Sequence, residues 1–482
     1  MEFILRLSKL VDQTCTQDPD ILGLSSDSRH VKPGDLFFAI PGLALDGRGF
    51  IEEAISKGAR AILTTEDNNK DHCSIPIIKV SNIRSKIPEI AAKFYQTPPK
   101  SVVMVTGTNG KSSTVSLYQQ LLCAKDIKAA SIGTLGIQSG LTLPFNDNFY
   151  GLTTPDPITL HRLLSQLGHN GFDHVAIEAT SIGLDQHRLN HVEIEAAAFT
   201  NFNQDHLDYH DTMDKYFEAK TLLFKQLMKP SKLAILNCES ERFDSLVSIC
   251  KERNQSILTY GKNAQADLRL IEIHPHLHGQ DLKIIYKNKE YSTTLSLLGE
   301  CQAYNLLTAL GLLIASGFAL EDLMPFVPLL KSIPGRLEQI DGAPIFVDYS
   351  HKPVALQNAI LSLKQHTEGK IIVVFGCGGN RDKGKRPIMG AIAQEFADDV
   401  IVTDDNPRFE DAAEIRQEIL STCPKAVEIA DRKKAIEEGM TRLRSGDILI
   451  VAGKGNETGQ IIGNQIIPFN DADIIKEFLG KV

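Results

Sequence analysis

The segment TGTNGKSS, residues 106–113, has the composition and spacing of a loop that binds phosphate. It follows the β-branched apolar run VVMVTG (102–107) and precedes SSTVSLYQQLLCAK (112–125), whose pattern predicts a helix. A glycine-rich turn between a strand and a helix lets backbone N–H groups surround phosphate oxygens. The segment therefore predicts an ATP or GTP site. Because Val105 breaks the general spacing GxxxxGK(S/T), a plain turn with a surface lysine is the alternative.

Individual residues of this loop have distinct expected tasks. Gly107 and Gly110 allow the backbone to curl toward the phosphates. The Lys111 ammonium would pair with the β- and γ-phosphates, and the Ser112 hydroxyl would ligate Mg²⁺.

Acidic, histidine and lysine side chains further along the chain form a second candidate group. Glu178 ends the strand-like run HVAIEA (174–179), at the sheet edge where ligands bind, and could hold Mg²⁺ together with Ser112; a surface glutamate in a loop is the alternative. The run DHLDYH (205–210) fits a metal cluster or the polar start of a helix equally well. Lys220, on DKYFEAKTLLFKQL (214–227), is expected on a solvated helix face when it is considered alone.

Three blocks of predicted elements position these residues. Strand-like runs in the first block flank the helical pattern FIEEAISKG (50–58), and the block ends at the linker-like TPPK (97–100). Strands alternate with helices in the other two blocks, which predicts parallel sheets. The predicted fold is α/β with three domains, residues 1–98, 99–333 and 334–482. The central domain would be a P-loop ATPase sheet and the C-terminal domain would be Rossmann-like, with these strand candidates: IFVDYS (345–350), KIIVVFG (370–376), DVIVTDD (399–405), AVEIA (426–430) and DILIVAG (447–453).

Two further apolar or glycine-rich segments carry no separate site. The run 306–320 is too short and too interrupted for a membrane span and predicts a buried helix. GCGGNR (376–381) departs from the dinucleotide fingerprint GxGxxG because residue 381 is arginine, so we reject a dinucleotide site there.

Composition excludes several classes of function. The 482 residues carry a formal net charge of −9, which disfavours a nucleic-acid binder or a protein of anionic membranes. The first residues contain no pattern of a secretory signal, and the eight cysteines form no CxxC pair. Reduced cysteines in a cytoplasmic protein are therefore expected.

The short loop spacing resembles that of the Mur ligases and the related folylpolyglutamate synthetases. Ten segments, spread in family order over all three blocks, are similar to the Mur ligase branch that extends UDP-N-acetylmuramoyl-L-alanyl-D-glutamate by a third residue. They are SDSRHVKPGDLFFAIPG, TTPD, EATSIGLDQHRL, TNFNQDHLDYH, YFEAK, PGRLE, VDYSHKP, GCGGNRDKGKRP, DDNPR and AGKGNE.

The resemblance implies an ATP-dependent acid–amino-acid ligase of peptidoglycan precursor synthesis. The D-Glu γ-carboxylate would attack the ATP γ-phosphate, and the amine of meso-diaminopimelate would then displace phosphate from the acyl phosphate. Two Mg²⁺ ions are implied, and Lys220 would be carbamylated by CO₂ to support the second one. The implied partners are small molecules, without nucleic acid or membrane insertion, and the protein would be a monomer.

The resemblance also assigns site residues in this sequence. Lys111, Glu178, His206 and Lys220 would act in catalysis, with Ser112, Glu178, His206 and carbamylated Lys220 on the metals. ATP would contact Gly107, Thr108, Asn109, Gly110, Lys111, Ser112, Ser113, Asn305, Arg336, Asp348 and His351. The UDP substrate would contact Ser26, Ser28, Leu43, Ala44, Leu45, Thr153, Thr154, Thr180, Gln186 and Arg188. Diaminopimelate would contact Arg381, Asp405, Asn406, Pro407, Arg408, Gly453 and Glu457.

Arg408 is the implied determinant of amino-acid specificity. Diaminopimelate carries a second carboxylate that lysine lacks, and a guanidinium that pairs with it would be left unpaired by lysine. Lysine-adding relatives lack this arginine. If the resemblance is set aside, the alternative for Arg408 is an arginine of a surface loop. Simple turn capping is the alternative for Ser26 and Ser28.

Five positions depart from the family pattern. Leu152 stands where an asparagine is usual, and Thr180 stands where a serine is usual, which keeps the hydroxyl. Gln302 replaces the first of two asparagines near ATP, and Asn380 and Asn456 stand where Asp and His are common. A lysine-adding ligase, a folylpolyglutamate synthetase and a non-catalytic nucleotide-binding relative remain as alternatives. DDNPR opposes the first, SDSR and TTPD oppose the second, and the joint presence of the loop, metal and Lys220 residues opposes the third.

Overall fold

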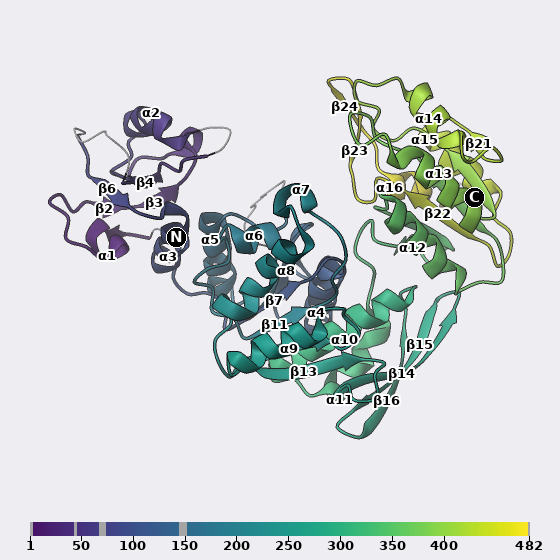
Figure 1. The fold of residues 1–482 in the computed structure, drawn as a ribbon, viewed down its shortest axis with the longest axis horizontal. Helices are drawn as coiled ribbons and strands as arrows, with labels where there is room; N and C mark the ends of the chain where they lie inside the picture. Colours follow the sequence, from purple (N-terminus) through teal and green to yellow (C-terminus); the bar gives the residue numbers. More distant parts are fainter. Residues whose placement is uncertain (1–2, 43–45, 67–73, 144–151, 481–482) are drawn as a thin grey trace. The chain divides into compact units, whose positions relative to one another are not determined.

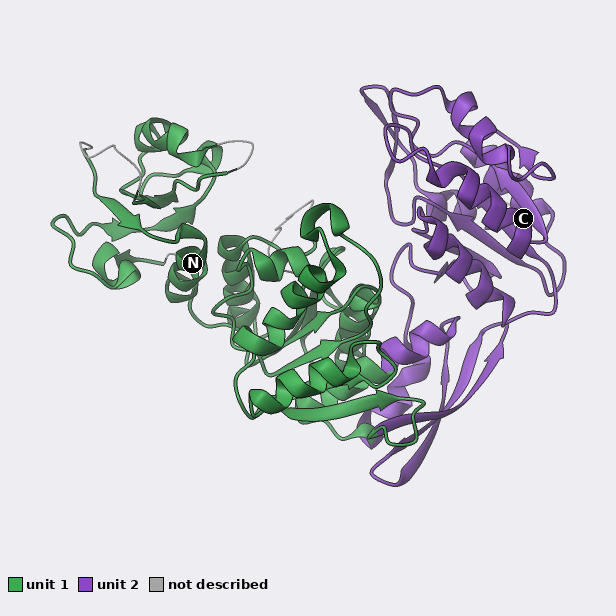
Figure 2. Cartoon of the chain, viewed as in Figure 1, with its two compact units in different colours: residues 1–267, 307–320 green, residues 268–306, 321–482 purple. Residues whose placement is uncertain are grey.

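The computed structural model describes residues 3–42, 46–66, 74–143 and 152–480 (Figure 1). Two compact units divide the chain, and Figure 2 colours them separately. One unit holds residues 1–267 and 307–320, and the other holds 268–306 and 321–482. The chain passes between them at three places, one of which falls inside helix α10 (Glu300–Ala315).

The N-terminal part of the first unit contains a small parallel sheet. Its strands follow the order β3-β4-β5-β6. Alternate residues of β4 face opposite sides, so Leu36 and Phe38 join one apolar cluster with α3 while Phe37 packs with Ile51 of α2 in another. The elements are β1 (Leu5–Arg6), α1 (Leu7–Val11), β2 (Asp20–Ile21), β3 (Gly23–Ser25), η1 (Ser28–His30), β4 (Asp35–Phe38), η2 (Gly47–Phe50), α2 (Ile51–Ser56), β5 (Ala61–Thr65), β6 (Ile77–Val80) and α3 (Ile83–Phe94).

A larger sheet forms the rest of this unit. Its strands follow the order β13-β12-β11-β7-β10-β8-β9, and all neighbours are parallel except the edge strand β9. The strands are β7 (Ser101–Thr106), β8 (Ala129–Gly133), β9 (Gly136–Ser139), β10 (His174–Glu178), β11 (Ala196–Phe199), β12 (Leu233–Asn237) and β13 (Ser256–Gly261). The helices are α4 (Lys111–Ala124), α5 (Pro157–His169), α6 (Ser181–Asp185), α7 (Leu207–His210), α8 (Met213–Leu222), the π-helical η3 (Leu223–Leu227) and α9 (Phe243–Glu252).

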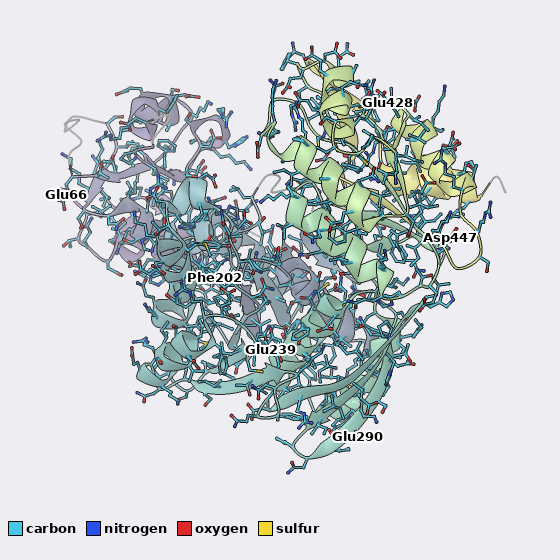
Figure 3. All side chains as sticks on the ribbon, turned by 45° about the vertical axis from the view of Figure 1, so that its right-hand side comes forward. Glu66, Phe202, Glu239, Glu290, Glu428 and Asp447 are labelled. Carbon is cyan, nitrogen blue, oxygen red and sulfur yellow. The ribbon has the colours of Figure 1, made fainter. Side chains whose placement is uncertain are left out.

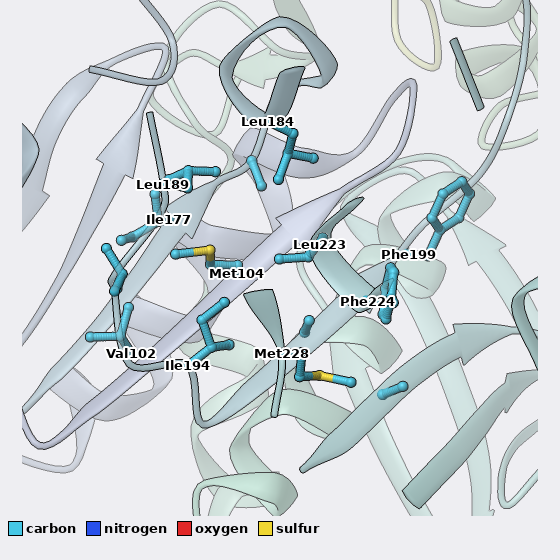
Figure 4. Packing of buried hydrophobic residues seen from close by; sticks show 14 of the residues in the cluster. Val102, Met104, Ile177, Leu184, Leu189, Ile194, Phe199, Leu223, Phe224 and Met228 are labelled. Atoms are coloured by element: carbon cyan, nitrogen blue, oxygen red, sulfur yellow. The ribbon is translucent and has the colours of Figure 1, made fainter. Parts of the chain in front are cut away.

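Burial of the central strands explains why they read as unbroken apolar runs. All six residues of β7 are buried, as expected for a strand covered on both faces. On one face Val102 and Met104 pack with Leu223, Phe224 and other residues of one large cluster (Figure 4). Helix α4 packs against β7, β8 and β10. This packing fixes the C-terminal end of β7, from which the glycine-rich loop starts.

The second unit begins with an antiparallel meander in the order β16-β15-β14. A C-terminal sheet follows in the order β17-β18-β22-β19-β20-β21, parallel except for the β17–β18 pair. Its strands are β14 (Leu268–His276), β15 (Gly279–Tyr286), β16 (Lys289–Leu295), β17 (Glu338–Gln339), β18 (Ile345–Asp348), β19 (Ile371–Phe375), β20 (Asp399–Val402), β21 (Val427–Glu428), β22 (Ile448–Ala452), β23 (Gly459–Ile462) and β24 (Gln465–Pro468). The remaining helices are α11 (Leu320–Leu323), η4 (Met324–Leu329), α12 (Pro353–Lys364), α13 (Lys385–Phe396), α14 (Ala412–Leu420), α15 (Arg432–Thr441) and α16 (Asp471–Leu479).

Helices cover both faces of the C-terminal sheet. Phe346, Val373 and Ile450 belong to the cluster that includes residues of α12, α13 and α14, whereas their neighbours along the same strands belong to a cluster with α15 and α16. This alternation is the doubly wound arrangement that the sequence predicts.

The predicted strand 426–430 is much shorter in the structure. Only Val427 and Glu428 form β21, and both are exposed. Glu428 lies on this edge strand (Figure 3), where its carboxylate accepts a hydrogen bond from Arg416 Nε at 2.7 Å. The hairpin formed by β23 and β24 was not predicted from the sequence.

The α/β class and the parallel sheets are confirmed. The domain limits 1–98, 99–333 and 334–482 remain predictions. Among the described residues, no helix is both long and apolar enough to cross a lipid bilayer.

Candidate functional site

The glycine-rich loop lies between β7 and α4, as predicted. Gly107 has φ +137°, and a Cβ there would lie 2.0 Å from Thr200 Oγ1, so this position excludes other residues. Gly110 adopts the left-handed region with φ +83° at the N-cap of α4. The loop also bonds to the chain after β11: Asn109 N–H donates to Asn201 Oδ1 at 2.9 Å. Contacts with the chain after β11 therefore fix the loop at the N-terminus of α4.

Two lysine side chains converge on one carbonyl of the loop. Lys111 Nζ donates to Gly107 O at 3.0 Å and to Thr108 O at 2.8 Å, and Lys220 Nζ donates to Gly107 O at 2.7 Å. Lys220 is only 1% exposed. Burial, and then the charge of Lys111, hold the pKa of Lys220 well below its ordinary value. The solvated helix face expected for Lys220 taken alone is therefore wrong, because the side chain points into the loop.

Tyr216 connects Lys220 to the loop, and the sequence reasoning missed it. Lys220 Nζ lies 4.4 Å from the centroid of the Tyr216 ring, which is the geometry of a cation–π contact. The Tyr216 hydroxyl and Thr108 Oγ1 share a hydrogen bond of 3.3 Å. Thr108 Oγ1 also donates to Asn203 O at 3.1 Å. The pattern YFEAK was available as a signal, since Tyr216 lies one helical turn before Lys220.

Glu178 and Ser112 meet at a shared partner, Thr134, which sequence reasoning also missed. Thr134 N–H donates to Glu178 Oε1 at 2.8 Å, and its hydroxyl donates to Glu178 Oε2 at 3.2 Å. Ser112 Oγ donates to Thr134 Oγ1 at 3.4 Å. Glu178 is 2% exposed, so it is not a surface glutamate. The Ser112 hydroxyl and a buried carboxylate therefore lie around one threonine at the carboxyl ends of the parallel strands.

The threonine and arginine residues predicted for the UDP substrate form a connected group. Thr154 Oγ1 donates to Glu178 O at 2.8 Å and shares a hydrogen bond of 2.9 Å with Thr180 Oγ1. Arg188 Nη1 donates to Thr154 O at 2.8 Å, and Arg188 Nη2 donates to Gln186 Oε1 at 2.8 Å. Burial lowers the pKa of Arg188. Thr153 joins through a 3.2 Å hydrogen bond with Thr134.

The run DHLDYH is divided between two environments. His206 has φ +51° and precedes the short helix α7, and its Nε2 lies 3.7 Å from Asp205 Oδ2. His210 is buried and shares a 2.9 Å hydrogen bond between its Nε2 and Ser181 Oγ, and burial lowers its pKa. Within the described ranges, no group of three or more His, Cys, Asp or Glu side chains is arranged to hold a metal ion.

The predicted residues of the small N-terminal sheet are engaged in turn contacts. Asp27 caps η1 by accepting from Arg29 N–H, and Ser28 Oγ donates to Glu53 Oε2 at 2.8 Å. Ser26 is exposed. Residues Leu43, Ala44 and Leu45 lie outside the described residues.

Residues predicted at the nucleotide in the second unit form two local groups. Asp348, at the end of β18, accepts from Leu337 N–H at 2.8 Å and from Ser350 N–H at 2.9 Å, and burial raises its pKa. Arg336 lies over the Tyr349 ring at 4.7 Å, and burial lowers the pKa of His351. Separately, Asn305 Nδ2 donates to Gln302 Oε1 at 3.1 Å.

Arg408 lies in the loop that follows β20. Its φ is +53°, and its backbone bridges to the β23–β24 hairpin: Arg408 N–H donates to Ile461 O at 3.0 Å, and Gly463 N–H donates to Arg408 O at 2.7 Å. Arg408 Nη1 donates to Gly379 O at 2.9 Å. Arg381 is exposed, and buried Pro407 precedes Arg408.

Asp405, Asn406, Gly453 and Glu457 converge beside this loop. Asn406 Nδ2 donates to Glu457 Oε2 at 2.8 Å. A Cβ on Gly453 (φ +115°) would lie 2.9 Å from Asp405 Oδ2, and burial raises the pKa of Asp405. Lys454 joins these four residues and was not predicted from the sequence. It has no exposed surface and contacts Asn406 and Glu457.

Comparison with known proteins places these sites in a family. Three family models match in chain order: "Mur ligase family, catalytic domain" over residues 20–96, "Mur ligase middle domain" over 105–313, and "Mur ligase, glutamate ligase domain" over 335–455. The order shows an N-terminal, a middle and a C-terminal domain.

Relatives match nearly the whole chain. Proteins named UDP-N-acetylmuramoyl-L-alanyl-D-glutamate–2,6-diaminopimelate ligase are 40% identical in Bradyrhizobium diazoefficiens (99% of each chain) and 42% identical in Caulobacter vibrioides (97% of each). A solved structure with that name matches at 30% identity and a TM-score of 0.76 over 99% of each chain. A MurF ligase from Thermotoga maritima in complex with ADP shares the fold, with a TM-score of 0.63, 19% identity, and coverage of 95% of this chain and 97% of its own. The chain therefore belongs to the Mur ligase family.

Proposed function

We propose that this protein uses ATP to join meso-diaminopimelate to the D-Glu γ-carboxylate of UDP-N-acetylmuramoyl-L-Ala-D-Glu. Support comes from relatives that carry the name of this ligase and are 40% to 42% identical along the chain. The ligands would be small molecules: ATP, the UDP-linked dipeptide and the amino acid. The domain limits and the site residues assigned from the sequence are part of this proposal.

The observation that carries the amino-acid specificity is the fixed position of Arg408. Its backbone is held on both sides by the β23–β24 hairpin, and one guanidinium nitrogen is held by Gly379 O. An oriented guanidinium can grip the second carboxylate of diaminopimelate. Lysine has an ammonium without a carboxylate at that end and would leave the arginine unpaired.

The first chemical step would join the dipeptide carboxylate to the γ-phosphorus of ATP and release ADP. The loop around Gly107 would surround the phosphates, and Lys111, released from the carbonyls it now contacts, would pair with their charge. Arg188 would orient the dipeptide. In the second step the neutral amine would attack the acyl carbon and lose one proton, and phosphate would leave with the bonding electrons.

Two Mg²⁺ ions would bind among these residues. Ser112 and Glu178 offer hard oxygen ligands around Thr134, as Mg²⁺ prefers. His206 and Lys220 would serve the second ion, provided that Lys220 is carbamylated. When bound, the two ions would neutralise charge on the phosphate and on the attacking carboxylate.

The burial of Lys220 supports carbamylation. Only a neutral amine attacks CO₂, and the lowered pKa of Lys220 favours that neutral form. Attack forms an N–C bond, releases one proton and leaves a carbamate oxygen as a ligand. Protein equilibrated with ¹³CO₂ should give a carbamate carbon signal in NMR that Lys220→Met lacks. Active protein without that signal would contradict the modification.

Phosphate release from ATP tests the function as a whole. The UDP-linked dipeptide is supplied with meso-diaminopimelate, with L-lysine or with no amino acid. We expect turnover with diaminopimelate only. Turnover with lysine instead would overturn the specificity, and no turnover with either would overturn the ligase proposal.

A further inference from the structure

Lys454 is a buried lysine for which the proposed reaction has no assigned task. It follows β22 and has no exposed surface. Its three ammonium hydrogens have three acceptors: Asn406 Oδ1 at 3.0 Å, Glu457 Oε2 at 2.9 Å and Gly459 O at 2.8 Å. A buried lysine with every donor used fixes all the groups that it contacts.

The partners of Lys454 determine the orientation of Asn406. Lys454 Nζ and Ile461 N–H are donors only, so the Asn406 atom that both contact, at 3.0 and 2.9 Å, has to be the oxygen. The Asn406 nitrogen then donates to Glu457 Oε2 at 2.8 Å. Asn406 is 3% exposed and is held between Lys454 and Glu457.

Glu457 receives both of these hydrogen bonds on one oxygen. Asn406 Nδ2 and Lys454 Nζ both donate to Oε2, so within the described part of the chain Oε1 is left for another donor. The Glu457 side chain is 36% exposed. Glu457 thus presents one oriented carboxylate oxygen, which suits the ammonium of an amino acid.

Lys454 also anchors the hairpin that holds Arg408. Its bond to Gly459 O fixes the first residue of β23, and two residues later Ile461 O accepts from Arg408 N–H at 3.0 Å. Gln460 Nε2 adds a bond to Asp405 O at 2.7 Å. The ammonium therefore contacts Glu457 directly and is connected to Arg408 through the strand residues 459–461.

We propose that Lys454 is a positioning residue that orients Glu457 for the amine of the incoming amino acid and, through β23, Arg408 for its carboxylate. The inference rests on the proposed function, because it assigns these two residues to diaminopimelate. Lys454 itself would touch neither substrate nor ATP.

The test variant, Lys454→Met, removes the three donors and keeps an unbranched side chain one atom shorter. We expect the KM for diaminopimelate to rise about tenfold or more, because Glu457 and Arg408 lose their support. The KM values for ATP and for the UDP-linked dipeptide should stay within about twofold, since neither is read by these groups. The preference for diaminopimelate over lysine should also fall. An equal change in all three KM values, or none, would overturn the proposal.

Two further variants separate positioning from general destabilisation. Ile372→Val shortens a buried side chain of β19 and should lower Tm without raising the KM for diaminopimelate selectively. In a double-mutant cycle, Lys454→Met combined with Glu457→Gln should raise the KM for diaminopimelate by less than the product of the two single changes, because Lys454 acts in part through Glu457. Independent, multiplying losses would contradict this.

The proposed function can fail without obscuring the result. If the wild-type protein uses lysine rather than diaminopimelate, the function proposal is wrong. The same cycle is then run with lysine, whose side-chain ammonium suits Glu457 equally. A selective, non-additive rise in the KM for lysine supports Lys454 as a positioning residue, and its absence overturns that role. A wild-type protein with no turnover at all overturns both proposals.

Discussion

Both the backbone and the side chain of Arg408 are constrained by hydrogen bonds. Its left-handed φ of +53° is uncommon for a residue with a Cβ and persists here because the hairpin bonds hold its N–H and its carbonyl. Strain at a residue that carries a functional group is expected where surrounding contacts over-determine the conformation. The held guanidinium is thereby made available to a ligand carboxylate.

Replacing Arg408 by lysine should change which amino acid is used. Lys keeps a positive charge but loses the planar, bidentate donors, so we expect kcat/KM for diaminopimelate to fall about 100-fold, equivalent to about 3 kcal/mol. The kcat/KM for lysine should not fall. Steady-state kinetics with both amino acids measures this, with the exposed Arg253→Lys as a matched control. Equal losses for both amino acids would remove Arg408 from specificity.

The Tyr216 hydroxyl should contribute to the affinity for ATP through its hydrogen bond with Thr108. Tyr216→Phe keeps the ring beneath Lys220 but removes the hydrogen bond with Thr108 Oγ1. We expect the Kd for ATP to rise about fivefold, which corresponds to about 1 kcal/mol, the usual contribution of one hydrogen bond. Calorimetric titration measures it. The control is Tyr260→Phe, at a second buried tyrosine that lies on β13, and it should leave the Kd for ATP unchanged.

At the scale of elements, the connection between β7 and α4 depends on the close approach of Gly107 to Thr200. Gly107→Ala should abolish nucleotide binding and lower stability by about 2 kcal/mol or more, because it adds a clash to an unfavourable φ. Gly136 also has a positive φ, +74°, but open space around it. Gly136→Ala therefore measures the backbone cost alone and should leave ATP binding intact. Thermal unfolding and ATP titration measure the loss of stability and of ATP affinity in both variants. Equal losses in the two variants would contradict a clash between Gly107→Ala and Thr200.

Local patterns predicted the central strands better than the buried polar contacts. The apolar runs around Val102 and Ile371 became buried strands of parallel sheets, because such strands need apolar residues on both faces. Burial of Lys220 and Lys454 could not be predicted from spacing. Lys220 depends on Gly107, and Lys454 on Asn406, which are distant in sequence. The strand 426–430 was overestimated because β-branched composition does not report edge exposure.

At the scale of the whole molecule, both compact units contain buried or half-buried histidines that favour the neutral form. Burial lowers the pKa of His161, His174 and His210 in one unit and of His351 and His366 in the other. Such groups bind protons in the unfolded chain before they do so in the folded one. Their contribution to stability is complete above the unfolded pKa of about 6.5 and is lost as the pH falls below it.

His161 offers a clean measurement of this effect. It is 5% exposed, burial lowers its pKa to about 4, and its Nε2 donates to Asn190 O at 3.1 Å. Between pH 8 and pH 5 it should account for about 2 kcal/mol of lost stability, or a few degrees in Tm. His161→Gln keeps a donor but does not titrate, so the Tm of this variant should fall less over that range than the wild-type Tm. The exposed His278→Gln is the control and should follow the wild-type profile. An equal fall in Tm between pH 8 and pH 5 for His161→Gln and for the wild-type protein would mean that burial does not hold His161 neutral. Only a group whose pKa differs between the folded and unfolded states contributes to the pH dependence of stability.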